Sequence, residues 1–149
     1  TINSYTITTS GDSHITITTT SSVNYGSNKT VSFNVASGFT ITSITIDSIA
    51  LTGSDLSTAI SNGSYTFTSV NANRSIAVYS ENSTYVVTYN AGTNGVVSPS
   101  TATYTVGGSG VTLPTPTRTS FHFVGWYTSS SGGSKIGDNM ELIQTRSLI

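Results

Sequence analysis

The sequence predicts a mostly β fold, and three observations support this prediction. Short runs of Ile, Val, Tyr and Phe alternate with Thr, which is the pattern of strands with one buried face. The chain has 28 Thr and 27 Ser among 149 residues, whereas the helix-favouring residues Leu, Ala and Met are sparse. Clusters of Gly, Asn and Ser separate the runs, as turns do. We therefore expect two small antiparallel-sheet modules in tandem, with at most one short helix.

In the first half, alternation begins at residues 5–8 and 14–18. These two runs flank the turn-forming segment 10–13, so they predict a hairpin. Residues 31–35 form the next strand, because their Val and Phe side chains share one face. Another strand follows at 41–46, where the spacing of the Ile residues slips by one position and indicates a bulge.

A short helix is expected at residues 54–60, with Ser54 or Asp55 as its cap. Two more strands follow at 65–67 and 76–79. The polar segment after them, from residue 80, breaks the pattern. We therefore expect one module at residues 1–80 and a second at 81–149.

The second half has its own series of strands. They are expected at 85–89, 102–106, 111–113 and 121–127, with a Ser/Gly loop at 129–134. Both halves open with a Tyr-containing strand and then pass through a turn rich in Gly and Asn. This internal similarity supports a tandem arrangement.

The composition excludes several classes of protein. Only 7% of residues are charged and the net charge is −1, so the chain lacks the basic surface that binds nucleic acid. There are no cysteines for disulfides or thiolate metal sites. No apolar run reaches the roughly 20 residues of a membrane span. The uncharged Thr/Ser coat is typical of an extracellular or cell-surface protein.

Two motifs of the second half point to a family. The segment Leu-Pro-Thr-Pro-Thr-Arg at 113–118 is followed closely by Phe-His-Phe-Val-Gly-Trp-Tyr at 121–127. With these motifs, residues 84–149 resemble the Listeria–Bacteroides repeat, the B-repeat family named from internalin B. Residues 5–80 resemble a divergent form of that repeat. The resemblance implies small β-grasp-like sheets, used in tandem on secreted and wall-attached proteins, and it implies no catalytic residues.

The sequence departs from the family at two places. Residues 51–63 form a longer insert than such modules usually carry. The second module is expected to close with an apolar strand, and the sequence reaches residue 149 about where that strand would begin. We therefore expect the last strand to be incomplete, with an open edge that residues 1–4 of a neighbouring copy could fill.

The sequence offers little for catalysis. His14 and His122 are the only histidines, and His122 alternates with two Phe residues, so we expect it to face solvent. No spacing brings the acidic residues together as a glycosidase pair or a metal site. They are Asp12, Asp47, Asp55, Glu81, Asp138 and Glu141. We predict no catalytic residue, no cofactor and no metal.

Two kinds of binding or modification site stay open. Trp126 and Tyr127 could form an aromatic platform for a sugar ring, although the alternative is that Trp126 fills the core of its module. Four sequons are candidate glycosylation sites. They are at Asn28, Asn62, Asn73 and Asn82.

The sequence therefore predicts a structural and adhesive function without catalysis. The modules would act as a spacer, stalk or filament-forming unit of an adhesin, with neighbouring modules or copies of the chain as partners. Host proteins and cell-surface glycans are further candidate partners. The alternative is a carbohydrate-binding, lectin-like module of a secreted protein.

Overall fold

The computed structural model describes residues 3–137 and 142–143. It divides the chain into two compact units, Thr1–Asn82 and Ser83–Ile149. Each unit has its own hydrophobic core among the described residues. The mostly β class with one short helix is confirmed.

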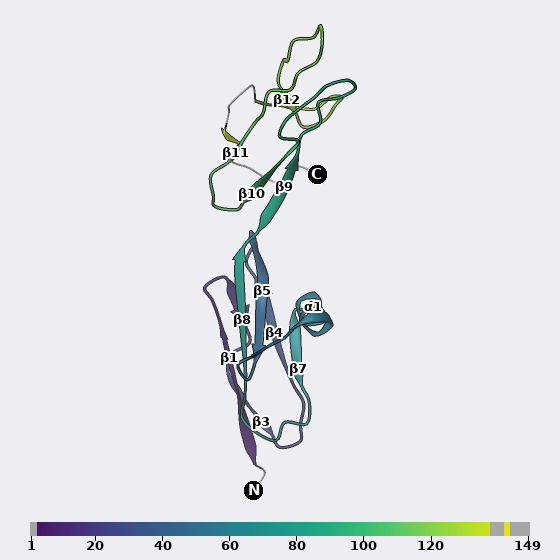
Figure 1. Cartoon of the computed structure of the whole chain (residues 1–149). Helices are drawn as coiled ribbons and strands as arrows, with labels where there is room; N and C mark the ends of the chain where they lie inside the picture. The colour runs from purple at the N-terminus through teal and green to yellow at the C-terminus, as the bar shows by residue number, and fades with distance from the viewer. Residues whose placement is uncertain (1–2, 138–141, 144–149) are drawn as a thin grey trace. The chain divides into compact units, whose positions relative to one another are not determined.

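The first unit contains a five-stranded sheet in the order β3-β1-β8-β5-β6. Figure 1 shows its central strands β1, β8 and β5 side by side. All its pairs are antiparallel except β1 with β8, which run parallel. Parallel neighbours need a long connection between them. Here the chain between β1 and β8, which contains the other strands of the unit and its helix, provides it. The bounds are Ser4–Gly11 for β1, Ser21–Asn24 for β3, Phe39–Ile46 for β5, Ile49–Ala50 for β6 and Arg74–Asn82 for β8.

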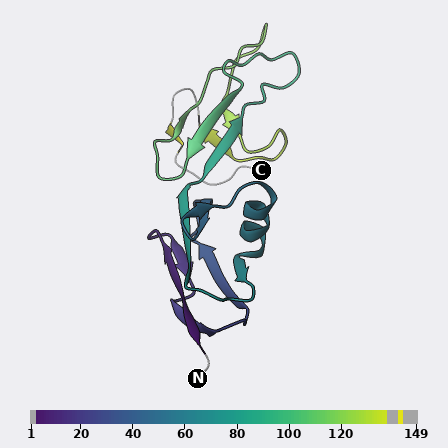
Figure 2. The same cartoon turned by 60° about the horizontal axis from the view of Figure 1, so that its bottom comes forward.

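A second sheet of the same unit has the order β2-β4-β7. Its strands are Ile15–Ile17, Lys29–Val35 and Ser64–Phe67. The helix α1, Gly53–Asn62, lies beside β7 (Figures 1 and 2). One core joins side chains from both sheets and the helix, because each strand turns its apolar face inward. Its largest fully buried side chains are Phe67, Ile7, Ile44, Ile76, Val31, Val70 and Val78.

The predicted hairpin of residues 5–8 with 14–18 is wrong. β1 and β2 belong to different sheets, and both edges of β1 are occupied by β3 and β8. The chain turns after β1, where the Ile15 N–H bonds to the Asp12 carbonyl oxygen, and a Cβ added at Gly11 would lie 2.9 Å from the side chain of Ile15. The turn-forming residues therefore make a corner between sheets instead of a hairpin within one.

The helix begins earlier than predicted, and its cap differs. The N-cap is Thr52, whose side chain makes no capping hydrogen bond, so neither Ser54 nor Asp55 caps the helix. At the other end Gly63 adopts a left-handed conformation (φ 60°), and its N–H bonds to the carbonyls of Ala59 and Ile60. Glycine suits this position because other residues are strained there.

The predicted bulge in residues 41–46 is confirmed, since the register of β5 against β8 shifts between Ile41 and Ser43. The following turn to β6 places both Asp47 (φ 51°) and Ser48 (φ 68°) in the left-handed region. This is the geometry of a tight hairpin turn. The Asp47 carboxylate secures the turn by accepting hydrogen bonds from Arg74 Nε and the Ser75 N–H.

The described part of the second unit contains three two-stranded pairs. They are β9 with β10, β11 with β14 and β12 with β13. The bounds are Thr84–Thr88, Thr101–Thr105, Val111–Thr112, Trp126–Tyr127, Lys135–Gly137 and Leu142–Ile143 for β9 to β14 in chain order. Among residues 83–137, the buried core cluster is formed by Tyr89, Leu113 and Trp126.

The strand expected at residues 121–127 is shorter in the structure. Only Trp126–Tyr127 of residues 121–127 is a strand, since Ser120 (φ 66°) and Gly125 (φ 138°) interrupt the extended backbone. β14 pairs antiparallel with β11. The incomplete last strand was expected around residues 147–149, which lie outside the described residues.

Candidate functional site

The structure brings one Ser, one Asp and one His together in the first unit. Asp12, in the corner after β1, accepts hydrogen bonds from the His14 backbone N–H (2.9 Å) and from the backbone N–H and hydroxyl of Ser80. His14 Nδ1 lies 3.6 Å from Asp12 Oδ1. The backbone N–H groups of His14 and Ser80 lower the pKa of the Asp12 carboxyl, because they stabilise its charged form.

The hydrogen bonds of this cluster do not connect its residues in the way that nucleophilic catalysis by a serine requires. A catalytic serine donates its proton to the imidazole, and the carboxylate orients that imidazole. Here the Ser80 hydroxyl donates to Asp12 instead, while the His14 ring stacks on Phe39 with centroids 3.6 Å apart and planes 13° apart. The cluster therefore ties the corner after β1 to β8. Sequence reasoning missed it, because Ser80 is distant from Asp12 in the chain.

The other titratable residues are dispersed. Asp47 pairs with Arg74, Asp55 lies in the first turn of α1, and Glu81 is exposed on β8. His122 is exposed in a loop of the second unit, and Asp138 and Glu141 lie outside the described residues. Among residues 3–137 and 142–143, no group of three or more His, Asp or Glu side chains could hold a metal ion.

Trp126 is a core residue of the second unit. Its side chain is buried, and its Nε1–H donates a 2.9 Å hydrogen bond to the Pro114 carbonyl. The rings of Tyr89 and Phe123 lie 5.4 and 5.5 Å from its ring, centroid to centroid. Little of its surface is open to a ligand. Tyr127 differs, because 44% of it is exposed.

The four sequon asparagines are all exposed. Asn28 Oδ1 accepts the Ser69 N–H, and Asn73 Oδ1 accepts the Thr6 N–H, both at 2.9 Å. Asn62 is the last residue of α1, and Asn82 is the last residue of β8. Each position is thus accessible, and two of the side chains already support a backbone contact.

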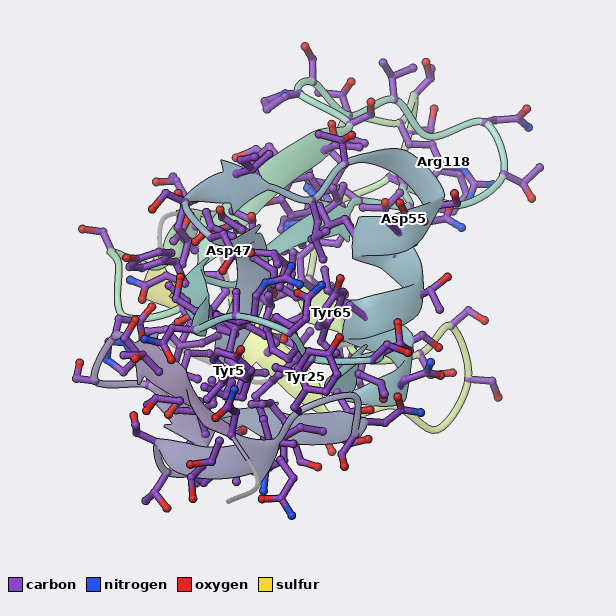
Figure 3. The ribbon with its side chains drawn as sticks, turned by 90° about the horizontal axis from the view of Figure 1, so that it is seen from below. Tyr5, Tyr25, Asp47, Asp55, Tyr65 and Arg118 are labelled. Atoms are coloured by element: carbon purple, nitrogen blue, oxygen red, sulfur yellow. The ribbon has the colours of Figure 1, made fainter. Side chains whose placement is uncertain are left out.

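Exposed aromatic rings occur in both units. Figure 3 shows Tyr5 and Tyr25 close together, and their ring centroids lie 6.4 Å apart. In the second unit Phe121 and Val124 are more than half exposed, beside a depression of about 190 Å³. The Arg118 guanidinium lies 3.8 Å from the centroid of the Phe121 ring, which is cation–π geometry.

A larger depression, of about 380 Å³, lies on the outward face of the five-stranded sheet. Strands β1, β5 and β8 form its floor, and Ala77 lies at its centre between Ser10 and Thr45. We call it the sheet groove. Sequence reasoning missed this feature, since it depends on the parallel pairing of β1 with β8. Its lining residues include Thr8, Ser10, Thr45, Ser48, Ser75 and Tyr79.

Comparison with known proteins gives one match. Residues 85–148 match the family model of the Listeria-Bacteroides repeat domain, which supports the resemblance expected for the second half. No curated protein and no solved structure matches the chain. None of the described helices is long and apolar enough to cross a membrane.

Proposed function

We propose, from the premise that the second unit is a Listeria-Bacteroides repeat domain, that this chain is part of an extracellular surface protein and performs no catalysis. Its two units would act as spacer or presentation modules within an adhesin, stalk or filament. The family match is the observation that supports this proposal most directly. The absence of charge across most of both units agrees with a structural role, because it lowers electrostatic repulsion between neighbouring modules.

The mechanical part of the proposal rests on how each unit is held together. In the first unit the backbone ladder of β5 with β8 extends from Phe39↔Asn82 to Ile46↔Ile76, and the parallel ladder of β1 lies on the other side of β8. Such ladders use backbone groups of every residue and need no charged side chains. A force applied along the chain would therefore be resisted by many hydrogen bonds at once.

The location is tested on intact cells of the source organism. Antibodies raised against the purified chain should label cells that have not been permeabilised, and brief protease treatment of whole cells should remove the label. An antibody against a cytoplasmic protein serves as the control and should stain only lysed cells. Labelling that appears only after lysis would overturn the proposal.

Association between copies is the finer part of the proposal. Within the described residues β9 pairs only with β10, and no described strand lies on its other edge. The edge strand is uncharged and exposes Tyr85 and Val86, the latter 69% exposed. An open, uncharged edge is a template for a strand from another chain. Copies of the chain would then associate through β9.

Two matched variants test this association. Val86→Lys places a charge on the open edge, whereas Val96→Lys places the same charge at a residue of similar exposure (66%) outside β9. In sedimentation velocity we expect the wild type and Val96→Lys to associate as concentration rises, and Val86→Lys to stay monomeric. A wild-type chain that remains monomeric throughout would refute association through this edge.

A further inference from the structure

We propose that the sheet groove binds an uncharged saccharide, with the Tyr79 ring as a platform and the surrounding hydroxyl groups as hydrogen-bond partners. This inference goes beyond the spacer function and does not depend on it. It also places the binding surface in the first unit, whereas Tyr127 belongs to the second.

The hydroxyl groups that line the sheet groove are unpaired within the described residues. Within the described residues, the side chains of Thr8, Ser10, Thr45, Ser48, Ser75 and Tyr79 make no hydrogen bond to another side chain or to the backbone. Some hydroxyls at the other sheet are paired instead. Thr30 and Thr66 bond to each other at 2.8 Å, and Thr18 bonds to Ser32. The groove thus gathers hydroxyls whose donors and acceptors are available.

The pairing of β1 and β5 with β8 places these hydroxyl groups next to one another. Thr8 lies opposite Ser75 and Ser10 opposite Ala77 in the parallel pair, while Thr45 lies opposite Ala77 in the antiparallel pair. The inward neighbours Ile76 and Val78 are buried, so residues 75, 77 and 79 face outward. The small side chain of Ala77 leaves a hollow between Ser10 and Thr45. Its volume, about 380 Å³, falls within the range of small-molecule sites.

The lining of the sheet groove is polar but uncharged. None of the lining residues is charged. Asp47 and Arg74, next to Ser48 and Ser75 in the chain, pair with each other, and Glu81 lies two residues beyond Tyr79 on β8. The lining itself therefore offers no charged group to an ionic ligand. Each Ser or Thr hydroxyl can both donate and accept, as a sugar hydroxyl can.

The aromatic ring supplies the apolar part of the site. Tyr79 is 47% exposed and lines the groove at one end of the outward row. The C–H face of a pyranose ring can pack on such a ring, while its hydroxyls bond to the neighbouring Ser and Thr side chains. A second copy of the chain is the less suitable occupant, because burying this many free hydroxyls in a dry interface would leave them unpaired.

The test uses the full chain labelled with ¹⁵N and titrated with cellotetraose, maltotetraose and chitotetraose. We expect at least one of these to bind with a Kd of about 1 mM or tighter and to shift amide resonances of β1, β5 and β8. Tyr79→Ala should weaken that binding at least tenfold. Tyr127→Ala is the matched control, since Tyr127 is 44% exposed, and it should leave the affinity unchanged.

A second variant covers the case in which Tyr79→Ala does not fold. The double substitution of Thr8→Val and Thr45→Val removes two groove hydroxyls and keeps the shape and strand preference of both residues. It should also weaken binding several-fold, whereas Thr16→Val, on an exposed position of β2, should not. The proposal is overturned if no tetrasaccharide binds, if the shifts centre on Tyr127, or if the groove variants bind like the wild type. None of these results bears on surface exposure, which the antibody labelling tests separately.

Discussion

Substitution of Trp126 should unfold the second unit and leave the first unit folded. Among the described residues the two core clusters share no residue, and that of the second unit is built around the buried side chains of Tyr89, Leu113 and Trp126. Removing a buried Trp side chain typically costs about 3–5 kcal/mol. A domain of this length has a free energy of unfolding of roughly 3–10 kcal/mol. Trp126→Ala therefore removes a large part of the stability of the second unit, or all of it.

A milder substitution separates packing from hydrogen bonding. Trp126→Phe keeps an aromatic ring against Tyr89 and Phe123 but deletes the donor to the Pro114 carbonyl. We expect a loss of about 1–2 kcal/mol, since a lost hydrogen bond also leaves its partner unpaired. For a small domain each kcal/mol lowers Tm by about 4–8 °C.

Differential scanning calorimetry of the full chain is the measurement. The wild type should show two transitions, and Phe67→Ala, in the core of the first unit, should lower only one of them. Trp126→Ala should abolish or lower the other. Tyr127→Ala, next in the chain but exposed, should change stability by less than about 0.5 kcal/mol. A single transition that shifts equally with Phe67→Ala and Trp126→Ala would refute the reasoning that each unit depends on its own core.

Three further predictions concern titration and backbone strain. Hydrogen bonding lowers the pKa of the Asp12 carboxyl below its usual value of 3.8, so its contribution to stability is present above that pH and is lost as the pH falls through the folded pKa. Asp12→Asn should therefore make the Tm of the first unit less dependent on pH in the acid range. An unchanged dependence would contradict the role of the carboxylate. Burial raises the pKa of Tyr89 above its usual value of 10.0, so the second unit should lose stability as the pH rises beyond that value. In a spectrophotometric titration, Tyr89→Phe should remove one ionisation that lies above pH 10.0. Gly63→Ala should lower the free energy of unfolding by about 1–2 kcal/mol in chemical denaturation, because a left-handed Ala is strained and its Cβ would lie 3.2 Å from the Phe33 carbonyl oxygen. Gly53→Ala is the control and should lower it less, because Gly53 has a similar φ but open space around it.

Sequence reasoning found the strands more reliably than it found their partners. Residues 31–35 and 76–79 lie within β4 and β8, and the face that Val31 and Phe33 share is buried as expected, because the alternation of apolar and polar side chains sets the faces of a strand. The hairpin of residues 5–8 with 14–18 failed for the opposite reason. Strands pair through backbone N–H and C=O groups, which are the same in nearly every residue. The sequence of a strand therefore does not determine which other strand it will pair with.

The features with chemical interest all depend on contacts between residues distant in the chain. Asp12 meets Ser80, and Asp47 meets Arg74, only because β1 and β5 both pair with β8. The sheet groove depends on the same pairings. In the second unit, the sequence left open whether Trp126 forms a platform for a sugar ring or fills the core. Its burial depends on how the segment packs against Leu113 and Tyr89.

The sequence by itself determined the β class, the single short helix, the uncharged hydroxyl surface and the repeat family of the second half. These properties are local or compositional, so each residue contributes to them without regard to its neighbours in space. Only the tertiary structure decided which strands adjoin, which carboxylates are tied down and which hydroxyls are left free. Those outcomes depend on long-range strand pairing, where burial of the apolar faces selects one arrangement among many with equivalent backbone hydrogen bonds.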